Sequence, residues 1–138
     1  MLVIKTLIVI MSLFSLVFAQ GWFNSPKEGL KVAKERGLPV MFYFYSEYCN
    51  SCKQMKKTVF SDEKVSRMMD RFVVISLDLL SEEGKVWGKR FNVYGTPAIV
   101  FYDAKNDRAL DVVFGSRSKE QFMAILSMMC LKMGLERC

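Results

Sequence analysis

The chain has 138 residues, of which 51% are hydrophobic and 25% are charged, and its formal net charge is +6. This length predicts one domain, the composition excludes an intrinsically disordered chain, and basic residues scattered without an aromatic and basic module argue against nucleic-acid binding. The sequence has no histidine, which excludes imidazole metal sites, Ser-His and Cys-His catalytic pairs and c-type haem attachment, and its four cysteines are too few for a disulfide-dense mini-protein.

The first 19 residues predict a signal peptide that is not part of the fold. Lys5 supplies a positive charge, and residues 6–19 are uncharged and mostly apolar. This apolar stretch of about 14 residues is short for a membrane span, which needs about 20. We therefore expect cleavage before Gln20 and a mature domain of residues 20–138 in the bacterial periplasm, where disulfides form and persist. A short uncleaved N-terminal anchor is the alternative.

The first predicted elements place a cysteine directly between a strand and a helix. A helix begins after Ser25, whose side chain can cap it, and ends at Gly37, because glycine accepts the left-handed conformation needed there. The continuous apolar and aromatic run at residues 38–45 is too short for a helix between such breakers and predicts a buried central strand. Cys49 then begins a helix that extends to about Thr58.

The rest of the chain alternates between short helices and apolar strands and ends in a hairpin and a helix. A short helix begins at residues 61–63, a buried strand follows at 72–77, and a helix runs from 81 to about 91. Strands at 97–102 and 109–114 are joined by a hairpin turn at 103–107, and a final helix begins at 118. This order predicts an α/β fold, in which a central mixed sheet of about four to five strands has helices on both faces.

Cys49 and Cys52 carry the strongest functional signal, because they open a helix directly after a buried strand. The N-terminal end of a helix offers unpaired N–H groups and the positive end of the helix dipole, so a thiolate at Cys49 is stabilised and is nucleophilic near neutral pH. The two-residue spacing puts Cys52 one turn along the helix, within disulfide reach. The pattern predicts that Cys49 attacks a disulfide and that Cys52 resolves the mixed disulfide.

Two other interpretations of this cysteine pair stay open. A zinc site needs two further ligands, and only Cys130 and Cys138, eight residues apart, could supply thiolates. A purely structural disulfide between Cys49 and Cys52 closes a very small loop and therefore stabilises little. We expect a separate disulfide between Cys130 and Cys138 that pins the C-terminal tail, with free thiols as the alternative.

A second motif, Gly-Thr-Pro at residues 95–97, stands just before a predicted strand, where proline is allowed. Taken with residues 45–53, Tyr-Ser-Glu-Tyr-Cys-Asn-Ser-Cys-Lys, it resembles the thioredoxin superfamily over about residues 22–131. Residues 52–62 resemble exported bacterial members, in particular the C-terminal domain of the transmembrane thiol:disulfide interchange reductase and the small periplasmic thioredoxins of sulfur oxidation. The resemblance implies a thioredoxin-like three-layer sandwich.

The resemblance also implies a role for each of five residues. Cys49 would be the exposed nucleophile and Cys52 the buried resolving thiol. Pro97 would be a cis proline facing them, and the backbone of Thr96 would hydrogen-bond an extended substrate peptide. Tyr48 stands where many thioredoxins carry tryptophan, so it would keep a flat aromatic surface next to the nucleophile. The resemblance implies no organic cofactor and no metal.

One core position departs from the family pattern. Thioredoxins bury an aspartate on the central strand, six residues before the first cysteine, as a proton relay to the resolving thiol. This chain has Tyr43 at that position. We expect Glu47 to be a solvated loop acid rather than a substitute relay. The departure concerns the rate and pH dependence of the reaction and leaves the dithiol chemistry itself in place.

Together these observations predict an exported thiol–disulfide oxidoreductase that works as a monomer through Cys49 and Cys52. Its substrates would be cysteine-containing exported proteins, and a membrane electron-donor protein would keep the dithiol reduced. Reduction is favoured over oxidation, because the stretch between the second and third strands is too short for the helical insertion of dedicated oxidases. A non-catalytic binding module of the same fold and a carrier of a soft metal such as Cu(I) are the alternatives.

Overall fold

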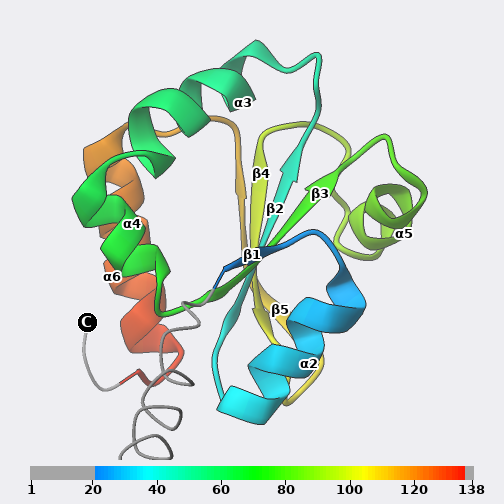
Figure 1. The fold of residues 1–138 in the computed structure, drawn as a ribbon, viewed down its shortest axis with the longest axis vertical. Coiled ribbons are helices and arrows are strands. Elements are labelled where there is room, and N and C mark those ends of the chain that lie inside the picture. Colours follow the sequence, from blue (N-terminus) through cyan, green and yellow to red (C-terminus); the bar gives the residue numbers. More distant parts are fainter. Residues whose placement is uncertain (1–20, 136–138) are drawn as a thin grey trace, which may run out of the picture.

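The computed structural model describes residues 21–135, which form a five-stranded sheet with helices on both faces (Figure 1). This architecture confirms the predicted α/β fold class, whereas the predicted signal peptide, residues 1–19, lies outside the described residues. The elements in chain order are β1 (Trp22–Phe23), α2 (Pro26–Arg36), β2 (Val40–Tyr45), α3 (Asn50–Met55), η1 (Lys56–Phe60), α4 (Glu63–Met69), β3 (Val73–Asp78), α5 (Glu82–Arg90), β4 (Ala98–Asp103), β5 (Arg108–Phe114) and α6 (Lys119–Lys132).

The sheet has the strand order β1-β3-β2-β4-β5. Strand β3 runs parallel to both β1 and β2, whereas β4 is antiparallel to both β2 and β5. The predicted hairpin of β4 and β5 is therefore confirmed. Strand β2 lies in the middle of the sheet and is covered on both faces, which explains why its sequence is an uninterrupted apolar run.

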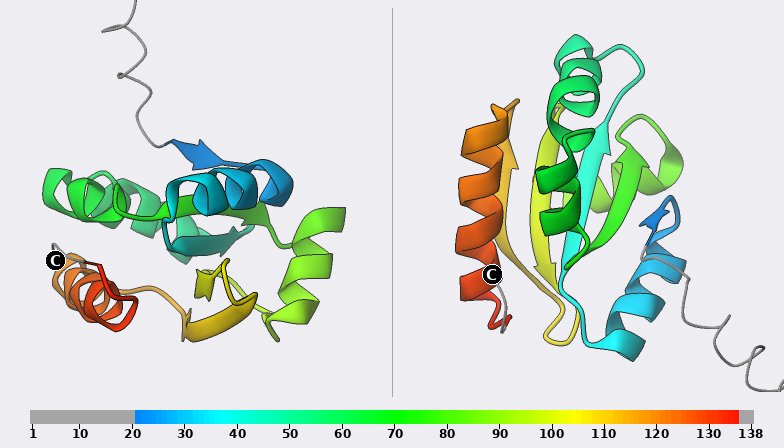
Figure 2. Two further views of the ribbon diagram at one scale, coloured as in Figure 1. Left: turned by 90° about the horizontal axis from the view of Figure 1, so that it is seen from below. Right: turned by 60° about the vertical axis from the view of Figure 1, so that its left-hand side comes forward.

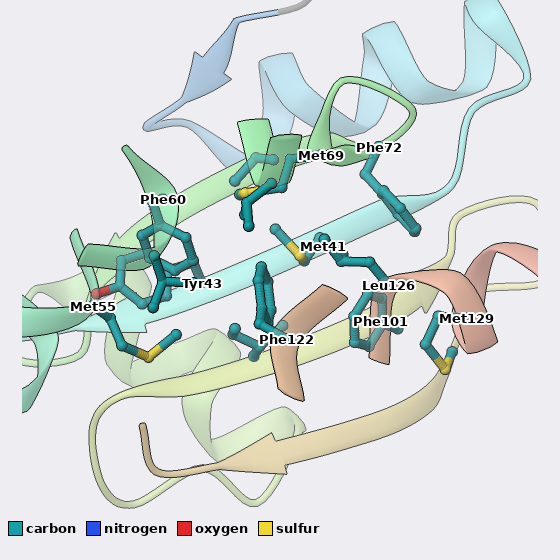
Figure 3. Packing of buried hydrophobic residues seen from close by; sticks show 14 of the residues in the cluster. Met41, Tyr43, Met55, Phe60, Met69, Phe72, Phe101, Phe122, Leu126 and Met129 are labelled. Atoms are coloured by element: carbon teal, nitrogen blue, oxygen red, sulfur yellow. The ribbon is translucent and has the colours of Figure 1, made fainter. Parts of the chain in front are cut away.

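Alternate residues of the strands pack against two different layers of helices. Met41 and Tyr43 of β2 belong to a cluster with α3, η1, α4 and α6, and we call this side of the sheet the α6 face. Phe42 and Phe44 belong to a second cluster with α2 and α5, on what we call the α5 face. Figure 2 shows the two layers on opposite sides of the sheet, and Figure 3 shows the packing of the α6 face.

The helix that begins at Cys49 differs from the prediction. The sequence predicts one α-helix to about Thr58, whereas α3 ends at Met55 and the chain continues as the π-helix η1. The wider turn brings both Val59 and Phe60 into the core. The Thr58 hydroxyl donates to the carbonyl oxygen of Gln54 over 2.8 Å. An apolar pattern with the 3.6-residue period cannot reveal a π-turn, which explains the difference.

Helices α2 and α5 each begin at a serine side-chain cap. The Ser25 hydroxyl accepts a backbone N–H of α2 over 3.4 Å, and Gly37 ends that helix with a φ of 64°, as predicted. The Ser81 hydroxyl accepts the N–H of Gly84 over 3.0 Å at the start of α5. A Cβ on Gly84 would overlap the carbonyl oxygen of Asp78. The start of α5 is therefore packed directly against the end of β3.

Strand β1 is absent from the sequence prediction, because two residues are too few to show an alternating pattern. Trp22 pairs with Val74, near the beginning of β3, and the two strands run parallel. The Trp22 ring lies edge-on to Tyr43 and Phe60, with ring centroids 6.0 and 5.3 Å apart. The strand thus adds one aromatic side chain to the edge of the α6 face.

Candidate active site

Cys49 and Cys52 form a disulfide at the start of α3, with their Cα atoms 5.2 Å apart. Cys49 is the N-cap of the helix and is partly exposed. Cys52 lies one turn further on and is only 4% exposed. The pair therefore offers one accessible and one shielded sulfur, which is the arrangement that a two-step thiol exchange requires.

Two hydrogen-bond donors converge on the sulfur of Cys49. The backbone N–H of Cys52 donates to it over 3.1 Å, and the Ser51 hydroxyl lies 3.4 Å away. Hydrogen bonds to the charged form of a group favour that form, so both donors would stabilise a Cys49 thiolate when the disulfide is reduced. Sequence reasoning missed Ser51, although a hydroxyl two residues beyond a capping cysteine is a signal that could have found it.

Ser46 fixes the loop that leads to Cys49. The Ser46 carbonyl accepts the Cys49 N–H over 3.1 Å, and the Ser46 hydroxyl accepts the Tyr48 N–H over 3.2 Å. The Tyr48 side chain itself is 84% exposed. An aromatic ring on an ordered loop next to the accessible sulfur offers a partner a flat surface, with a polar hydroxyl at its tip.

The second motif lies at the same edge of the sheet as this loop. The Thr96–Pro97 peptide bond is cis, as the resemblance implied. The first residue of β4 pairs with Phe44 near the end of β2, and the Pro97 carbonyl accepts the N–H of Gly115 over 2.9 Å. The topology therefore brings buried Pro97 and half-buried Thr96 to the end of the sheet from which the Cys49 loop departs.

Tyr43 occupies the position where the resemblance would place an aspartate. It is 5% exposed on the α6 face, and its ring packs edge-on against Phe60 at 5.0 Å (Figure 3). The pKa of Tyr43 is raised to about 12, mainly because the side chain is buried and to a smaller extent because of the charge of neighbouring Tyr45. Its phenol is therefore neutral at physiological pH. Glu47 is exposed, and no carboxylate within residues 21–135 is buried. The described part of the chain therefore gives Cys52 no buried carboxylate as a proton acceptor.

Cys130 lies near the C-terminal end of α6, and Figure 1 shows that this end of α6 and helix α3 lie at opposite ends of the molecule. It is buried, and Nη1 of Arg71, just before β3 begins, lies 3.9 Å from its sulfur. Cys49 instead follows the end of β2, which runs parallel to β3. A zinc ion shared by Cys130 and the pair is therefore contradicted. Cys138 lies outside the described residues, so its disulfide with Cys130 stays a prediction.

The described residues contain neither a membrane-spanning helix nor a cluster of metal ligands. Within residues 21–135, no helix has the length and hydropathy that a membrane span needs. The same part of the chain holds no group of three or more cysteine, aspartate or glutamate side chains placed to bind a metal. Among these residues, Cys49 and Cys52 are the two cysteines close enough together to share a soft metal ion when reduced.

Sequence comparisons place these features in a family context. The model of a family described as a thioredoxin-like domain matches residues 26–129. The thiol:disulfide interchange protein DsbD of Ralstonia nicotianae is 34% identical over 101 residues, which cover 72% of this chain and 17% of that protein. DsbD of Yersinia pestis is 33% identical over 103 residues, with the same two coverages. The chain thus spans about a sixth of the length of these curated relatives.

Comparison with solved structures gives the same picture of the fold. The solution structure of a thioredoxin from Thermus thermophilus has a TM-score of 0.77 and 38% sequence identity, and the match covers 85% of this chain and 92% of that one. The oxidised C-terminal domain of DsbD from Neisseria meningitidis has a TM-score of 0.66 at 19% identity, and the match covers 78% of this chain and 98% of that one. At that lower identity the likeness shows the fold alone.

Proposed function

This chain belongs to the thioredoxin-like domain family, whose model matches residues 26–129, and from that premise we propose that it is a thiol–disulfide oxidoreductase of exported proteins. The observation that carries the proposal is the asymmetric cysteine pair at the start of α3. Cys49 is accessible and receives two hydrogen-bond donors, whereas Cys52 is buried one turn away. The similarity to DsbD and to a thioredoxin supports the same type of chemistry.

The first step is attack by the Cys49 thiolate on one sulfur of a substrate disulfide. A bond forms between Cys49 and that sulfur, the substrate S–S bond breaks, and the other substrate sulfur leaves as a thiolate and takes up a proton. The Ser51 hydroxyl and the Cys52 N–H hold the attacking sulfur in its anionic form. Tyr48 and the Thr96 backbone would contact the substrate beside the reacting sulfur.

The second step is attack by Cys52 on the Cys49 sulfur of the mixed disulfide. The bond to the substrate breaks, the substrate leaves as a second thiol, and the disulfide between Cys49 and Cys52 forms. Two electrons have then passed from the protein to the substrate. An external dithiol returns the protein to its reduced form by the same exchange in reverse, so the cycle needs no organic or metal cofactor.

We propose that this cycle runs in the direction of substrate reduction in the periplasm. The predicted signal peptide supports export, and we propose that a membrane protein supplies the electrons. The reduction potential of the pair tests the direction. A value near roughly −270 mV, as in thioredoxin, fits a reductant, whereas a value near roughly −120 mV fits an oxidant and would reverse the proposed direction.

Two substitutions test the roles of the two sulfurs. Cys49→Ser removes the attacking sulfur, so turnover of a protein disulfide such as that of insulin should fall by at least about a thousand-fold. Cys52→Ser leaves the attack intact, so the protein should accumulate as a mixed disulfide with its substrate, visible as a mass adduct. Lys53→Ala changes an exposed neighbour on the same helix and is the matched control, with turnover within about two-fold of wild type.

Several outcomes would contradict the proposal. Turnover that survives Cys49→Ser would show that another group attacks the substrate. If the fully reduced wild-type protein reduces no disulfide, the chain is a non-catalytic binding module instead. Stoichiometric, tight binding of Cu(I) by the reduced protein, together with absent disulfide exchange, would favour the metal carrier.

A further inference from the structure

A second hollow lies away from the dithiol and has no part in the proposed exchange reaction. It lies between α4 and α6, where its volume is about 260 Å³, and we call it the α4–α6 pocket. Its lining includes buried Phe72 and Leu126 and half-buried Ser127. Its size is below the roughly 300–1,000 Å³ of pockets for drug-sized ligands, so any occupant is a small group.

Three of the side chains that line the pocket are cations: Lys64, Arg67 and Arg71. Their spacing of three and four residues places them on one side of α4 and the turn that follows it. Arg67 pairs with Glu63 over 3.9 Å, but both side chains are well exposed, so water screens this pair. Neither Lys64 nor Arg71 has a carboxylate partner within residues 21–135. The pocket therefore carries a local excess of positive charge.

Arg71 is the most informative of the three cations, because it is half-buried. The polar contact of its guanidinium is with the sulfur of Cys130, at 3.9 Å from Nη1, and sulfur is a weak acceptor. Partial burial of a guanidinium without an anionic partner is unfavourable. Its planar set of N–H donors matches the oxygens of a phosphate or carboxylate, which would relieve that cost.

We propose that the α4–α6 pocket binds a phosphoryl group or a similar tetrahedral oxyanion. Arg71 donates to two of its oxygens, Lys64 and Arg67 contribute positive charge from α4, and the Ser127 hydroxyl donates from α6. The apolar part of the lining, from Phe72 and Leu126, lowers the local dielectric constant and strengthens these contacts. Such a group is available from free phosphate or from the headgroup of an anionic lipid.

Inorganic phosphate is the first probe, added to the ¹⁵N-labelled full-length protein at constant ionic strength kept with sodium chloride. Saturable shifts of the Arg71 and Ser127 amide signals are expected, without shifts of the Cys49 and Cys52 signals. Arg71→Gln should weaken phosphate binding by about ten-fold or more, because it removes a charge-assisted contact. Arg36→Gln is the matched control, because it removes the same charge from an exposed position on α2 and should leave binding unchanged.

The same experiment has outcomes that overturn the proposal. Equal shifts with chloride alone would show that the protein attracts anions through its overall positive charge and not through a specific site. Equal weakening of phosphate binding in Arg71→Gln and Arg36→Gln would show the same. Lys64→Gln, at an exposed site, gives a second test if Arg71→Gln fails to fold, and unchanged phosphate binding in that variant would also contradict the assignment.

Vesicles distinguish the two sources of the phosphoryl group. Flotation with phosphatidylcholine vesicles that contain phosphatidylglycerol, and loss of flotation in Arg71→Gln, would assign the pocket to a lipid headgroup. Phosphate binding without flotation would assign it to a soluble oxyanion. Insulin reduction by Arg71→Gln should equal that of wild type in either case, so failure of this proposal is distinguishable from failure of the proposed redox function.

Discussion

The two faces of the sheet are packed with different kinds of side chain. On the α5 face, Phe42 makes ring contacts with four other aromatic side chains at centroid distances of 5.0–6.3 Å, and the buried cluster described there contains no methionine. On the α6 face, four methionines are buried among the aromatic residues: Met41, Met55, Met69 and Met129. Aromatic rings have preferred pair geometries, whereas methionine adapts its shape to its neighbours.

The methionine-rich face is also the face that carries the candidate active site. The α6 face carries α3 with its cysteine pair and the π-turn η1, whereas the α5 face carries no residue of the candidate active site. Met55 lies one helical turn after Cys52, so an adaptable buried side chain shares the side of α3 that carries the shielded sulfur. The comparison suggests a rigid aromatic face that supports a more adaptable reactive face.

The largest expected effect on stability is at the centre of the aromatic cluster. Phe42→Ala should lower the free energy of unfolding by about 4–5 kcal/mol, because it leaves a cavity and removes four ring contacts. Phe101→Ala, equally buried on the α6 face but with one ring contact, should cost about 3 kcal/mol. Urea unfolding of both variants measures the difference, and equal losses would remove the distinction between the faces.

Unfolding at alkaline pH tests whether the α6 face holds the phenol of Tyr43 in its neutral form. Above pH 10 the unfolded Tyr43 phenol ionises, whereas the folded one keeps its proton until its raised pKa of about 12. The unfolded state then binds fewer protons, so the free energy of unfolding falls as pH rises. Between pH 9 and 12, wild type should lose about 2–3 kcal/mol more than Tyr43→Phe. Parallel curves for the two proteins would show that the phenol is not held in its neutral form.

A smaller loss is expected where α5 meets the sheet. Gly84→Ala would place a methyl group against the Asp78 carbonyl oxygen, so the start of α5 has to move outwards. We expect a loss of about 2 kcal/mol, within the range for overpacked sites. Lys85→Ala, at the next and exposed position, is the control and should be close to neutral. An unchanged melting temperature of Gly84→Ala would show that the α5 layer is less rigid than its aromatic packing suggests.

The smallest effect is expected on the methionine side. Met55→Leu keeps the side-chain volume, so an adaptable core should lose only about 1 kcal/mol or less. The rate of disulfide exchange should stay within about two-fold of wild type, because Cys52 keeps an apolar neighbour of similar size. A loss as large as that of Phe101→Ala would show that the α6 face is packed as specifically as the α5 face.

The elements that the sequence predicted well are those with long, uniform patterns. Residues 38–45 predicted the central strand because both its faces are buried, and Ser25 and Gly37 marked the ends of α2 by cap chemistry. Strand β1 and the π-turn were missed for opposite reasons. The first is too short to show a period, and the second interrupts the period of the helix that contains it.

The candidate site was predictable to the extent that motifs define it. The positions of Cys49 and Cys52, the disulfide between them and the cis bond before Pro97 followed from the spacing and the resemblance. The Ser51 contact depends on the rotation of a side chain within the first turn of α3. The Ser51 contact is local, and a hydroxyl two residues after a capping cysteine could have indicated it. The absence of a carboxylate partner for Arg71 among residues 21–135 depends on which segments meet between α4 and α6. Tertiary packing decides the surroundings of Arg71, so these could not be read from local sequence.

The pairing of Trp22 with Val74 has a geometric consequence for how this domain can be attached to something else. The described chain enters the sheet near the beginning of β3, whereas Cys49 follows the opposite end of the adjacent strand β2. The length of the strands separates these two points by roughly 15–20 Å. A domain coupled through its N-terminal side to a bead, an electrode or a fusion partner would therefore present its disulfide outwards, on the side remote from the attachment.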